Sequence, residues 1–203
     1  MTEPKPPKSL SSSPGLRQHW RPDRGWLTAV GPGQYCVSDS REILTTVLGS
    51  CIAACIWEPD ARLGGLNHFL LPRGLDEKTR PSDALRYGAF AMETLVNEVL
   101  KHGGVRRNLK AKVFGGAHML RGVKDMGRQN IDFVHQYLYD EGIRLVTEDV
   151  GGTRGRKIEF FPSTGRVRLK LLKEVERVPL VERESLYLKE ISSQSVGGDI
   201  ELF

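Results

Sequence analysis

The sequence predicts an α+β domain in which two main helices and mostly antiparallel strands form layers. Short runs rich in β-branched residues alternate with Gly, Pro, Asn and Asp turn signals over residues 34–71 and 143–172. Residues 83–102 carry apolar side chains at helical spacing. The run 52–57 is apolar on both faces, which is typical of a strand covered by helices on one side and by other strands on the other.

The chain divides into a tail, a main domain and an extension. Residues 1–14 hold four prolines and four serines without a hydrophobic period, so we expect a disordered or loosely attached tail over residues 1–25. The main domain is predicted to span residues 26–175. Residues 176–203 form a C-terminal extension of mixed polar composition that ends in Gly197-Gly198-Asp199-Ile200-Glu201-Leu202-Phe203.

Local signals place the elements of the main domain in order. Strands are predicted at residues 35–37, 43–48, 52–58, 63–71, 110–114, 143–150, 157–161 and 166–172. A helix over 83–102 begins at an N-cap of Ser82 or Asp83 and stops at Gly103-Gly104, and a second covers about 128–141. In the strand 52–57, even-numbered side chains face one way and odd-numbered side chains the other.

Composition and charge exclude several classes of protein. The longest apolar run has six residues, from Ile52 to Trp57, whereas a membrane-spanning helix needs roughly 20. No apolar stretch follows the first basic residues, so we expect no secretory signal, and three cysteines favour a reducing cytoplasm. The net charge of +5 comes from 30 basic and 25 acidic residues spread along the chain, without a nucleic-acid-binding motif. We therefore expect no nucleic-acid partner, and a mild positive field would also suit an acidic protein partner.

Cys51 and His68 are the candidate catalytic pair. A two-residue loop centred on Pro59-Asp60 would pair residues whose numbers sum to 119, which sets Cys51 directly opposite His68 on one face. The imidazole could then take the thiol proton, and later protonate a leaving amine. Gly49-Ser50 allow a sharp turn that could expose the sulfur and aim backbone N–H groups at an oxyanion.

The other candidate residues and segments have structural explanations as well as functional ones. The third group that orients the imidazole could be Thr45, Thr46, Ser50 or Asn67. Cys36 and Cys55 are expected to be small buried hydrophobes. The other histidines show no metal-ligand spacing, and two glycine-rich segments, 115–117 and 151–157, fit tight β-turns better than phosphate cradles.

Several motifs in order resemble the chemoreceptor glutamine deamidase family CheD. The first two are Thr45-Thr46-Val47-Leu48-Gly49-Ser50-Cys51 and Gly64-Gly65-Leu66-Asn67-His68-Phe69-Leu70-Leu71-Pro72. The others are Arg86-Tyr87-Gly88, residues 111–117, Gly127-Arg128-Gln129-Asn130, Gly151-Gly152 with Gly155-Arg156-Lys157, and the ending 197–203. The resemblance covers residues 30–175 and the ending, while the tail of residues 1–25 is long for the family.

The resemblance implies an α/β/β layered sandwich similar to deamidating toxins of the cytotoxic-necrotizing-factor type. It implies a protein-glutamine glutaminase, active in chemotaxis adaptation, that converts glutamines in the cytoplasmic helices of methyl-accepting chemotaxis receptors to glutamates. Cys51 matches the nucleophile, His68 the base and Thr45 the third catalytic residue. No metal or organic cofactor is implied. Some family members also bind the phosphatase CheC, and the sequence leaves open whether this one does.

Three hypotheses follow for the function. The first is a cytoplasmic deamidase, whose helical-bundle substrate predicts a shallow cleft with the Cys51 sulfur near the surface. The second is a module of the same fold that docks to receptors or to a CheC-like partner without catalysis. The third is another cysteine hydrolase, a protease or a transglutaminase.

Overall fold

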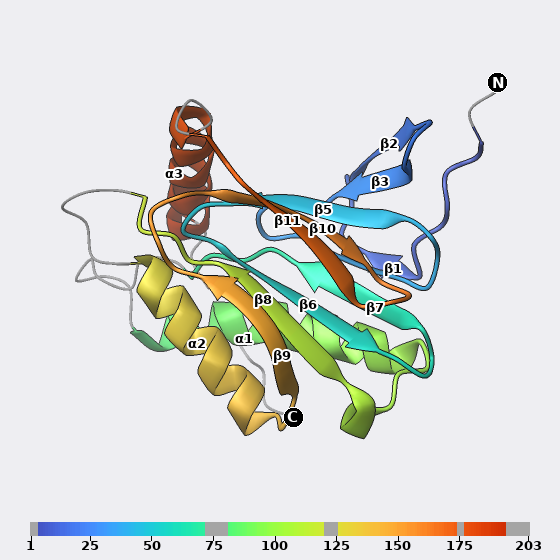
Figure 1. Cartoon of the computed structure of the whole chain (residues 1–203). Helices are drawn as coiled ribbons and strands as arrows, with labels where there is room; N and C mark the ends of the chain where they lie inside the picture. The colour runs from blue at the N-terminus through green and yellow to red at the C-terminus, as the bar shows by residue number, and fades with distance from the viewer. Residues whose placement is uncertain (1–3, 72–80, 120–125, 174–176, 194–203) are drawn as a thin grey trace.

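The computed structural model describes residues 4–71, 81–119, 126–173 and 177–193. Within these ranges two β-sheets pack face to face, and helices α1 (Pro81–Lys101) and α2 (Met126–Asp140) cover the outer face of one of them (Figure 1). The layers are therefore helices, sheet, sheet. This arrangement confirms the predicted α+β layered class.

The two sheets have six and five strands in the described part of the chain. Sheet A has the order β1 (Ser11–Ser12), β4 (Tyr35–Ser38), β7 (Leu63–Asn67), β6 (Ile52–Glu58), β8 (Lys110–Gly115) and β9 (Arg144–Val150). Sheet B has the order β11 (Arg166–Leu171), β10 (Arg156–Phe161), β5 (Ile43–Leu48), β3 (Gly25–Ala29) and β2 (Arg17–Arg21). As predicted, most neighbours are antiparallel; the pairs β3–β5 and β8–β9 are parallel.

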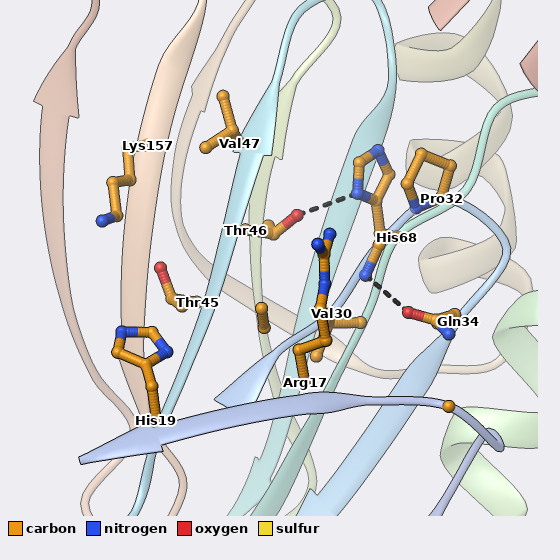
Figure 2. Close-up of a pocket in the computed structure, with 13 residues that line it drawn as sticks. Arg17, His19, Val30, Pro32, Gln34, Thr45, Thr46, Val47, His68 and Lys157 are labelled. Atoms are coloured by element: carbon orange, nitrogen blue, oxygen red, sulfur yellow. Dashed lines mark hydrogen bonds between the residues drawn. The ribbon is translucent and has the colours of Figure 1, made fainter. Parts of the chain in front are cut away.

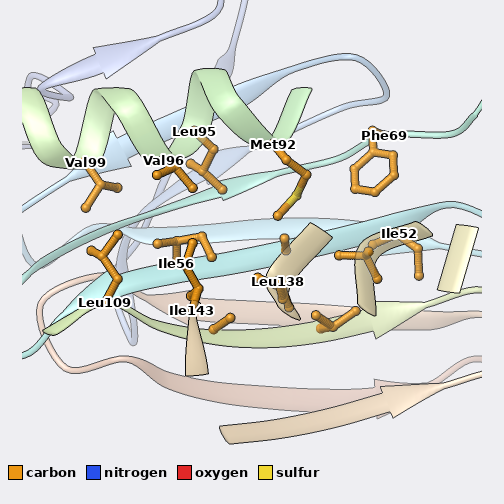
Figure 3. Packing of buried hydrophobic residues seen from close by; sticks show 14 of the residues in the cluster. Ile52, Ile56, Phe69, Met92, Leu95, Val96, Val99, Leu109, Leu138 and Ile143 are labelled. Atoms are coloured by element: carbon orange, nitrogen blue, oxygen red, sulfur yellow. The ribbon is translucent and has the colours of Figure 1, made fainter. Parts of the chain in front are cut away.

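The central strand β6 is buried on both faces, as its sequence predicted. Ile52 and Ile56 pack under α1 in the cluster between sheet A and the helices (Figure 3). Cys55 and Trp57, on the opposite face, belong to the cluster between the two sheets. Because each face of β6 contributes to a different core, this strand links the two halves of the hydrophobic interior.

Structure begins earlier in the chain than the sequence predicted. β1 pairs with β4, and β2 pairs with β3 at the edge of sheet B, so residues 11–12 and 17–21 take part in the sheets. β2 is mostly exposed along its sequence Arg-Gln-His-Trp-Arg, and an exposed edge strand needs no alternating hydrophobic pattern. The parts of the expected tail that form these strands are therefore held by backbone pairing rather than by a core.

The C-terminal extension contains a helix that the sequence analysis did not predict, α3 (Arg177–Ser193). It stands at one end of the two sheets (Figure 1). Leu180, Glu184 and Leu188 are buried at intervals of four residues, which places them on one face of the helix. A buried carboxylate replaces the hydrophobic residue expected at the middle of such a face, so the amphipathic pattern was weak.

Gly65 in β7 provides a test of the packing between sheet A and α1. A Cβ at this position would lie 2.6 Å from Leu95 Cδ1 and 2.7 Å from Val37 Cγ2. We expect Gly65→Ala to lower the free energy of unfolding by about 1–3 kcal/mol through overpacking. Chemical denaturation measures the loss, with Lys170→Ala on the exposed face of β11 as a control that changes little. Equal midpoints for the two variants would contradict this packing.

Candidate active site

The segment from Gly49 to Cys51 joins the two sheets, since β5 ends at Leu48 in sheet B and β6 begins at Ile52 in sheet A. Cys51 has no exposed surface and belongs to the cluster between the sheets. This finding corrects the expectation of a sulfur near the surface. Leu188 of α3 belongs to the same cluster, so the unpredicted helix contributes to this burial.

The hairpin of β6 and β7 has a longer loop than predicted. β6 ends at Glu58 and β7 begins at Leu63, so four residues form the loop instead of two. The Glu58 carboxylate accepts a hydrogen bond from the N–H of Ala61 inside the loop, and Arg62 takes a left-handed φ of 55°. These features favour the longer loop, and the register of the hairpin shifts by two residues.

This shift moves Cys51 and His68 from opposed to diagonal positions. Ile52 and Phe69 exchange two backbone hydrogen bonds of 2.9 Å, so His68 stands opposite Ala53 and diagonal to Cys51. The predicted direct opposition is therefore wrong. Because the side-chain period of a strand is two, a shift by two keeps both side chains on the face toward sheet B. Diagonal neighbours stand roughly 7–8 Å apart, still within reach of long side chains.

Thr46 is the residue that contacts the imidazole. Its Oγ1 lies 2.8 Å from His68 Nδ1 (Figure 2). Thr46 shares its strand face with Leu44, which packs between the sheets, whereas Thr45 points the other way and donates its hydroxyl to the Ile158 carbonyl at 2.9 Å. The resemblance implied Thr45 as the third catalytic residue. The structure instead brings its neighbour to the imidazole, because successive strand residues face opposite sides.

The two other candidates for the third group bind elsewhere. The Ser50 hydroxyl donates to the Glu184 carboxylate at 2.7 Å. The Asn67 amide accepts a hydrogen bond from the N–H of Ala54 at 3.0 Å and donates one to the Ala91 carbonyl of α1 at 2.9 Å. Asn67 thus joins β6 to α1 on the helix side of sheet A.

A cavity of about 220 Å³ borders the Thr46–His68 pair. β3 ends at Ala29, which pairs with Thr45, so β5 has no strand neighbour on that side from Thr46 onward in the described residues. This unpaired part of β5, from Thr46 onward, borders the cavity (Figure 2). Its basic lining residues are Arg17, His19 and Lys157. Arg17 and Lys157 therefore bring two positive charges to the lining of the cavity beside this pair.

The backbone carbonyls of the Gly49–Cys51 turn accept hydrogen bonds from the residues after β8 and from α2. The carbonyls of Gly49, Ser50 and Cys51 accept hydrogen bonds from Ala117 N–H at 2.7 Å, Asn130 Nδ2 at 2.9 Å and Gly116 N–H at 2.8 Å, respectively. The chains approach so closely that a Cβ on Gly115, whose φ is +117°, would overlap the Cys51 carbonyl oxygen. The glycine-rich segment 115–117 therefore serves to hold the cysteine turn.

Asn130, which sequence reasoning did not single out as a site residue, connects the turn to the His68 segment. It is fully buried on α2, and its Oδ1 accepts a hydrogen bond from the Leu71 N–H at 2.9 Å while its Nδ2 binds the Ser50 carbonyl. One amide group thus ties the backbone next to Cys51 to the backbone three residues after His68. The feature of the sequence that could have identified Asn130 as a site residue was its place in the Gly127-Arg128-Gln129-Asn130 motif.

Arg156 fixes the neighbouring end of sheet A. Its buried guanidinium donates to the carbonyls of Asp149 at 2.7 Å and Gly151 at 2.6 Å, and also to that of Gly115. Burial lowers the pKa of Arg156, while the charge of Asp149 opposes this change. The segment 151–157 is therefore used for internal hydrogen bonding.

The surroundings of the other two cysteines disfavour the thiolate form. Burial raises the pKa of Cys36 to about 12, against a smaller opposing effect of the Ser9 hydroxyl. Burial also raises the pKa of Cys55, which is fully enclosed between the sheets. A thiol that stays protonated at neutral pH is a poor nucleophile, which agrees with their predicted role as buried hydrophobes.

Glu184 of α3 is the most unexpected member of the site. Its carboxylate accepts hydrogen bonds from the N–H groups of Gly49 at 2.8 Å, Ser50 at 3.0 Å and Cys51 at 3.4 Å. Consecutive backbone N–H groups that converge on one anion form a nest. The turn before Cys51 therefore binds a carboxylate beside the thiol.

A layered α+β protein that gathers a thiol, an imidazole and a threonine hydroxyl on facing sheets has the groups needed for nucleophilic cysteine chemistry. Comparison with known proteins identifies the family. The model of the family CheD, described as CheD chemotactic sensory transduction, matches residues 70–171. The chain belongs to the CheD family.

Full-length relatives support this assignment. A protein of Hahella chejuensis named probable chemoreceptor glutamine deamidase CheD is 42% identical, over 98% of this chain and 95% of the relative. A protein of the same name from Halorhodospira halophila is 42% identical, over 97% of this chain and 94% of the relative. Among solved structures, the hypothetical protein YfiH of Bacillus licheniformis has a TM-score of 0.39, 10% identity, and coverage of 57% of this chain and 49% of that chain.

Among the described residues, no helix is both long and apolar enough to cross a membrane. The same residues contain no group of three or more His, Cys, Asp or Glu side chains arranged to hold a metal ion.

Asn130 gives a test of how the turn is held. In Asn130→Ala the Ser50 carbonyl and the Leu71 N–H lose their partner inside the protein, so we expect a loss of about 2–4 kcal/mol in the free energy of unfolding. Gln129→Ala, on the exposed side of the same helix, is the matched control and should change stability little. Urea denaturation of the two variants measures the difference. Similar stabilities would show that the amide does not carry this connection.

Proposed function

We propose that this protein deamidates glutamine side chains of chemotaxis receptors through a covalent intermediate on Cys51. The observation that carries the proposal is the Thr46–His68 hydrogen bond of 2.8 Å, formed on the same face of sheet A that carries Cys51. The names of the relatives support the receptor glutamine as substrate. Conversion of glutamine to glutamate in the cytoplasmic part of a receptor would act in chemotaxis adaptation and would place the protein in the cytoplasm.

In the first step the Cys51 sulfur attacks the side-chain carbonyl carbon of the glutamine. His68 takes the thiol proton, with Thr46 holding Nδ1 so that Nε2 performs the transfer. The oxygen of the tetrahedral intermediate carries a negative charge. The N–H groups of Gly49 and Cys51 converge on one oxygen position and that of Ser50 points to a neighbouring one, so this turn supplies donors suited to stabilise the charge.

In the second step the intermediate collapses and the C–N bond breaks. The imidazolium of His68 gives its proton to the leaving nitrogen, which departs as ammonia and leaves a thioester on Cys51. A water molecule, deprotonated by His68, then attacks the thioester carbon. Release of glutamate returns the thiol, so the net reaction is amide plus water to acid plus ammonia.

Replacement of Cys51 is the direct test of this mechanism. Cys51→Ala should lower ammonia release from a receptor cytoplasmic fragment by roughly a thousandfold or more, because the proposed thioester can no longer form at residue 51. Cys55→Ala removes a buried thiol from β6, the strand that follows Cys51, and should keep the activity, so it serves as the matched control. Mass spectrometry of the receptor should show about +1 Da at each modified glutamine with wild type, the change from amide to acid.

Three outcomes would contradict the proposal. Cleavage of the receptor chain would indicate a protease instead. Unchanged deamidation by Cys51→Ala would refute the nucleophile, and receptor binding without any deamidation by wild type would favour a docking module.

The two adjacent threonines allow a second test. Thr46→Val removes the hydroxyl that orients His68 and should lower kcat by roughly tenfold or more, with a small effect on KM. Thr45→Val removes a hydroxyl bonded to the Ile158 carbonyl and should leave kcat nearly unchanged. Steady-state ammonia release by the two variants decides between them. A larger loss in Thr45→Val would assign the role to Thr45.

A further inference from the structure

Helix α3 binds the proposed active site with one continuous face. Leu180, Glu184 and Leu188 are buried, and Tyr187 next to them is half-buried. The Tyr187 hydroxyl hydrogen-bonds with that of Tyr87 on α1. The helix therefore docks through side chains that reach the inter-sheet cluster, the cysteine turn and α1.

The carboxylate of Glu184 is the centre of this contact. One oxygen, Oε1, accepts from the N–H groups of Gly49 at 2.8 Å and Cys51 at 3.4 Å, and the other accepts from the N–H and the hydroxyl of Ser50 at 3.0 and 2.7 Å. Only 4% of Glu184 is exposed. A carboxylate is removed from water only where such hydrogen bonds replace its hydration.

The turn is shaped to admit this group. A Cβ on Gly49 would lie 2.8 Å from both carboxylate oxygens, so a larger residue would push the carboxylate out. Glycine at this position lets the backbone approach the bound group closely. The binding site is thus formed by the backbone itself, directly before the residue proposed as nucleophile.

The bound group has the chemistry of a reaction product. Deamidation turns a glutamine side chain into a glutamate side chain, and here a glutamate side chain, presented by a helix, fills the nest beside Cys51. We propose that Glu184 is an intramolecular product mimic, and that α3 occupies the surface on which a substrate helix docks. This inference rests on the proposed function. The N–H groups of the turn then bind the carbonyl oxygen of a substrate glutamine once α3 has moved away.

The proposal explains why Cys51 has no exposed surface in an enzyme that acts on another protein. With α3 docked, the substrate surface is occupied and the protein is inhibited by its own C-terminal helix. If roughly nine molecules in ten hold α3 docked, removal of the Glu184 carboxylate lowers the apparent KM about tenfold.

Alkylation of the cysteines tests the docking without reference to activity. Full-length wild type, Glu184→Ala and Glu182→Ala are treated with iodoacetamide, and each cysteine is followed by peptide mass spectrometry. Glu182 is an exposed residue of the same helix and gives the matched control. We expect about tenfold faster labelling of Cys51 in Glu184→Ala alone, with Cys36 and Cys55 as slow internal references. Equal Cys51 rates in all three proteins would overturn the proposal.

The variant Glu184→Gln tests whether the side chain occupies the substrate position. It keeps the shape of the residue but offers Cys51 a carboxamide. Attack by the sulfur releases the side-chain nitrogen of the introduced glutamine as ammonia with a proton from His68, and water then releases glutamate from the thioester. We expect the purified variant to gain about 1 Da at residue 184 with time, and the double variant with Cys51→Ala to retain the amide.

Kinetics with a receptor fragment separate this proposal from the proposed function. Glu184→Ala should lower KM about tenfold at unchanged kcat, whereas Glu182→Ala should match wild type. Suppose that wild type deamidates the receptor, that the Glu184→Gln variant keeps its introduced amide, and that Glu184→Ala keeps the wild-type KM. The product-mimic proposal is then wrong, while the proposed function stands. If wild type leaves receptor glutamines unchanged, the proposed function fails, while the alkylation rates still report on α3.

Discussion

The whole site depends on one short crossing of the chain between two sheets. The segment Gly49–Cys51 leaves sheet B and enters sheet A, and hydrogen bonds hold its backbone on both sides. Its carbonyls bind the β8 end and α2, while its N–H groups bind Glu184 of α3. Because its backbone N–H and C=O groups are hydrogen-bonded, this turn cannot change its conformation without breaking bonds to the surrounding elements. The position of the thiol is therefore set by two sheets and two helices together.

The packing of the two sheets also brings the imidazole of His68 and the hydroxyl of Thr46 together. His68 follows a strand of sheet A, and Thr46 belongs to a strand of sheet B, so their hydrogen bond spans the space between the sheets. Neither sheet alone carries the complete set of groups. Correct packing of the hydrophobic cluster between the sheets is thus a condition for the proposed chemistry, as well as for stability, and the early end of β3 leaves the opening beside the pair.

Local patterns predicted most of the fold, and the errors have physical causes. The two-faced apolar pattern of β6 and the helical period of α1 depend on nearby residues, so both were predicted correctly. The hairpin register was wrong because the loop is set by the Glu58 side chain, which turn signals do not reveal. The edge strands near the N-terminus are held by backbone pairing, and α3 buries the carboxylate of Glu184 between Leu180 and Leu188, so neither shows a regular hydrophobic period. The choice between Thr45 and Thr46 depended on which face of β5 meets sheet A, which no local pattern shows.

The enclosed thiol has a consequence for the lifetime of the protein in the cell. Sulfur oxidation by peroxide proceeds from an accessible thiolate to sulfenic acid and then to sulfinic acid, which is irreversible in most proteins. Cys51 has no contact with solvent while α3 is docked. On the proposal that α3 occupies the substrate surface, an idle molecule preserves the sulfur of Cys51 against oxidative damage, and exposes it only while a substrate takes the place of the helix.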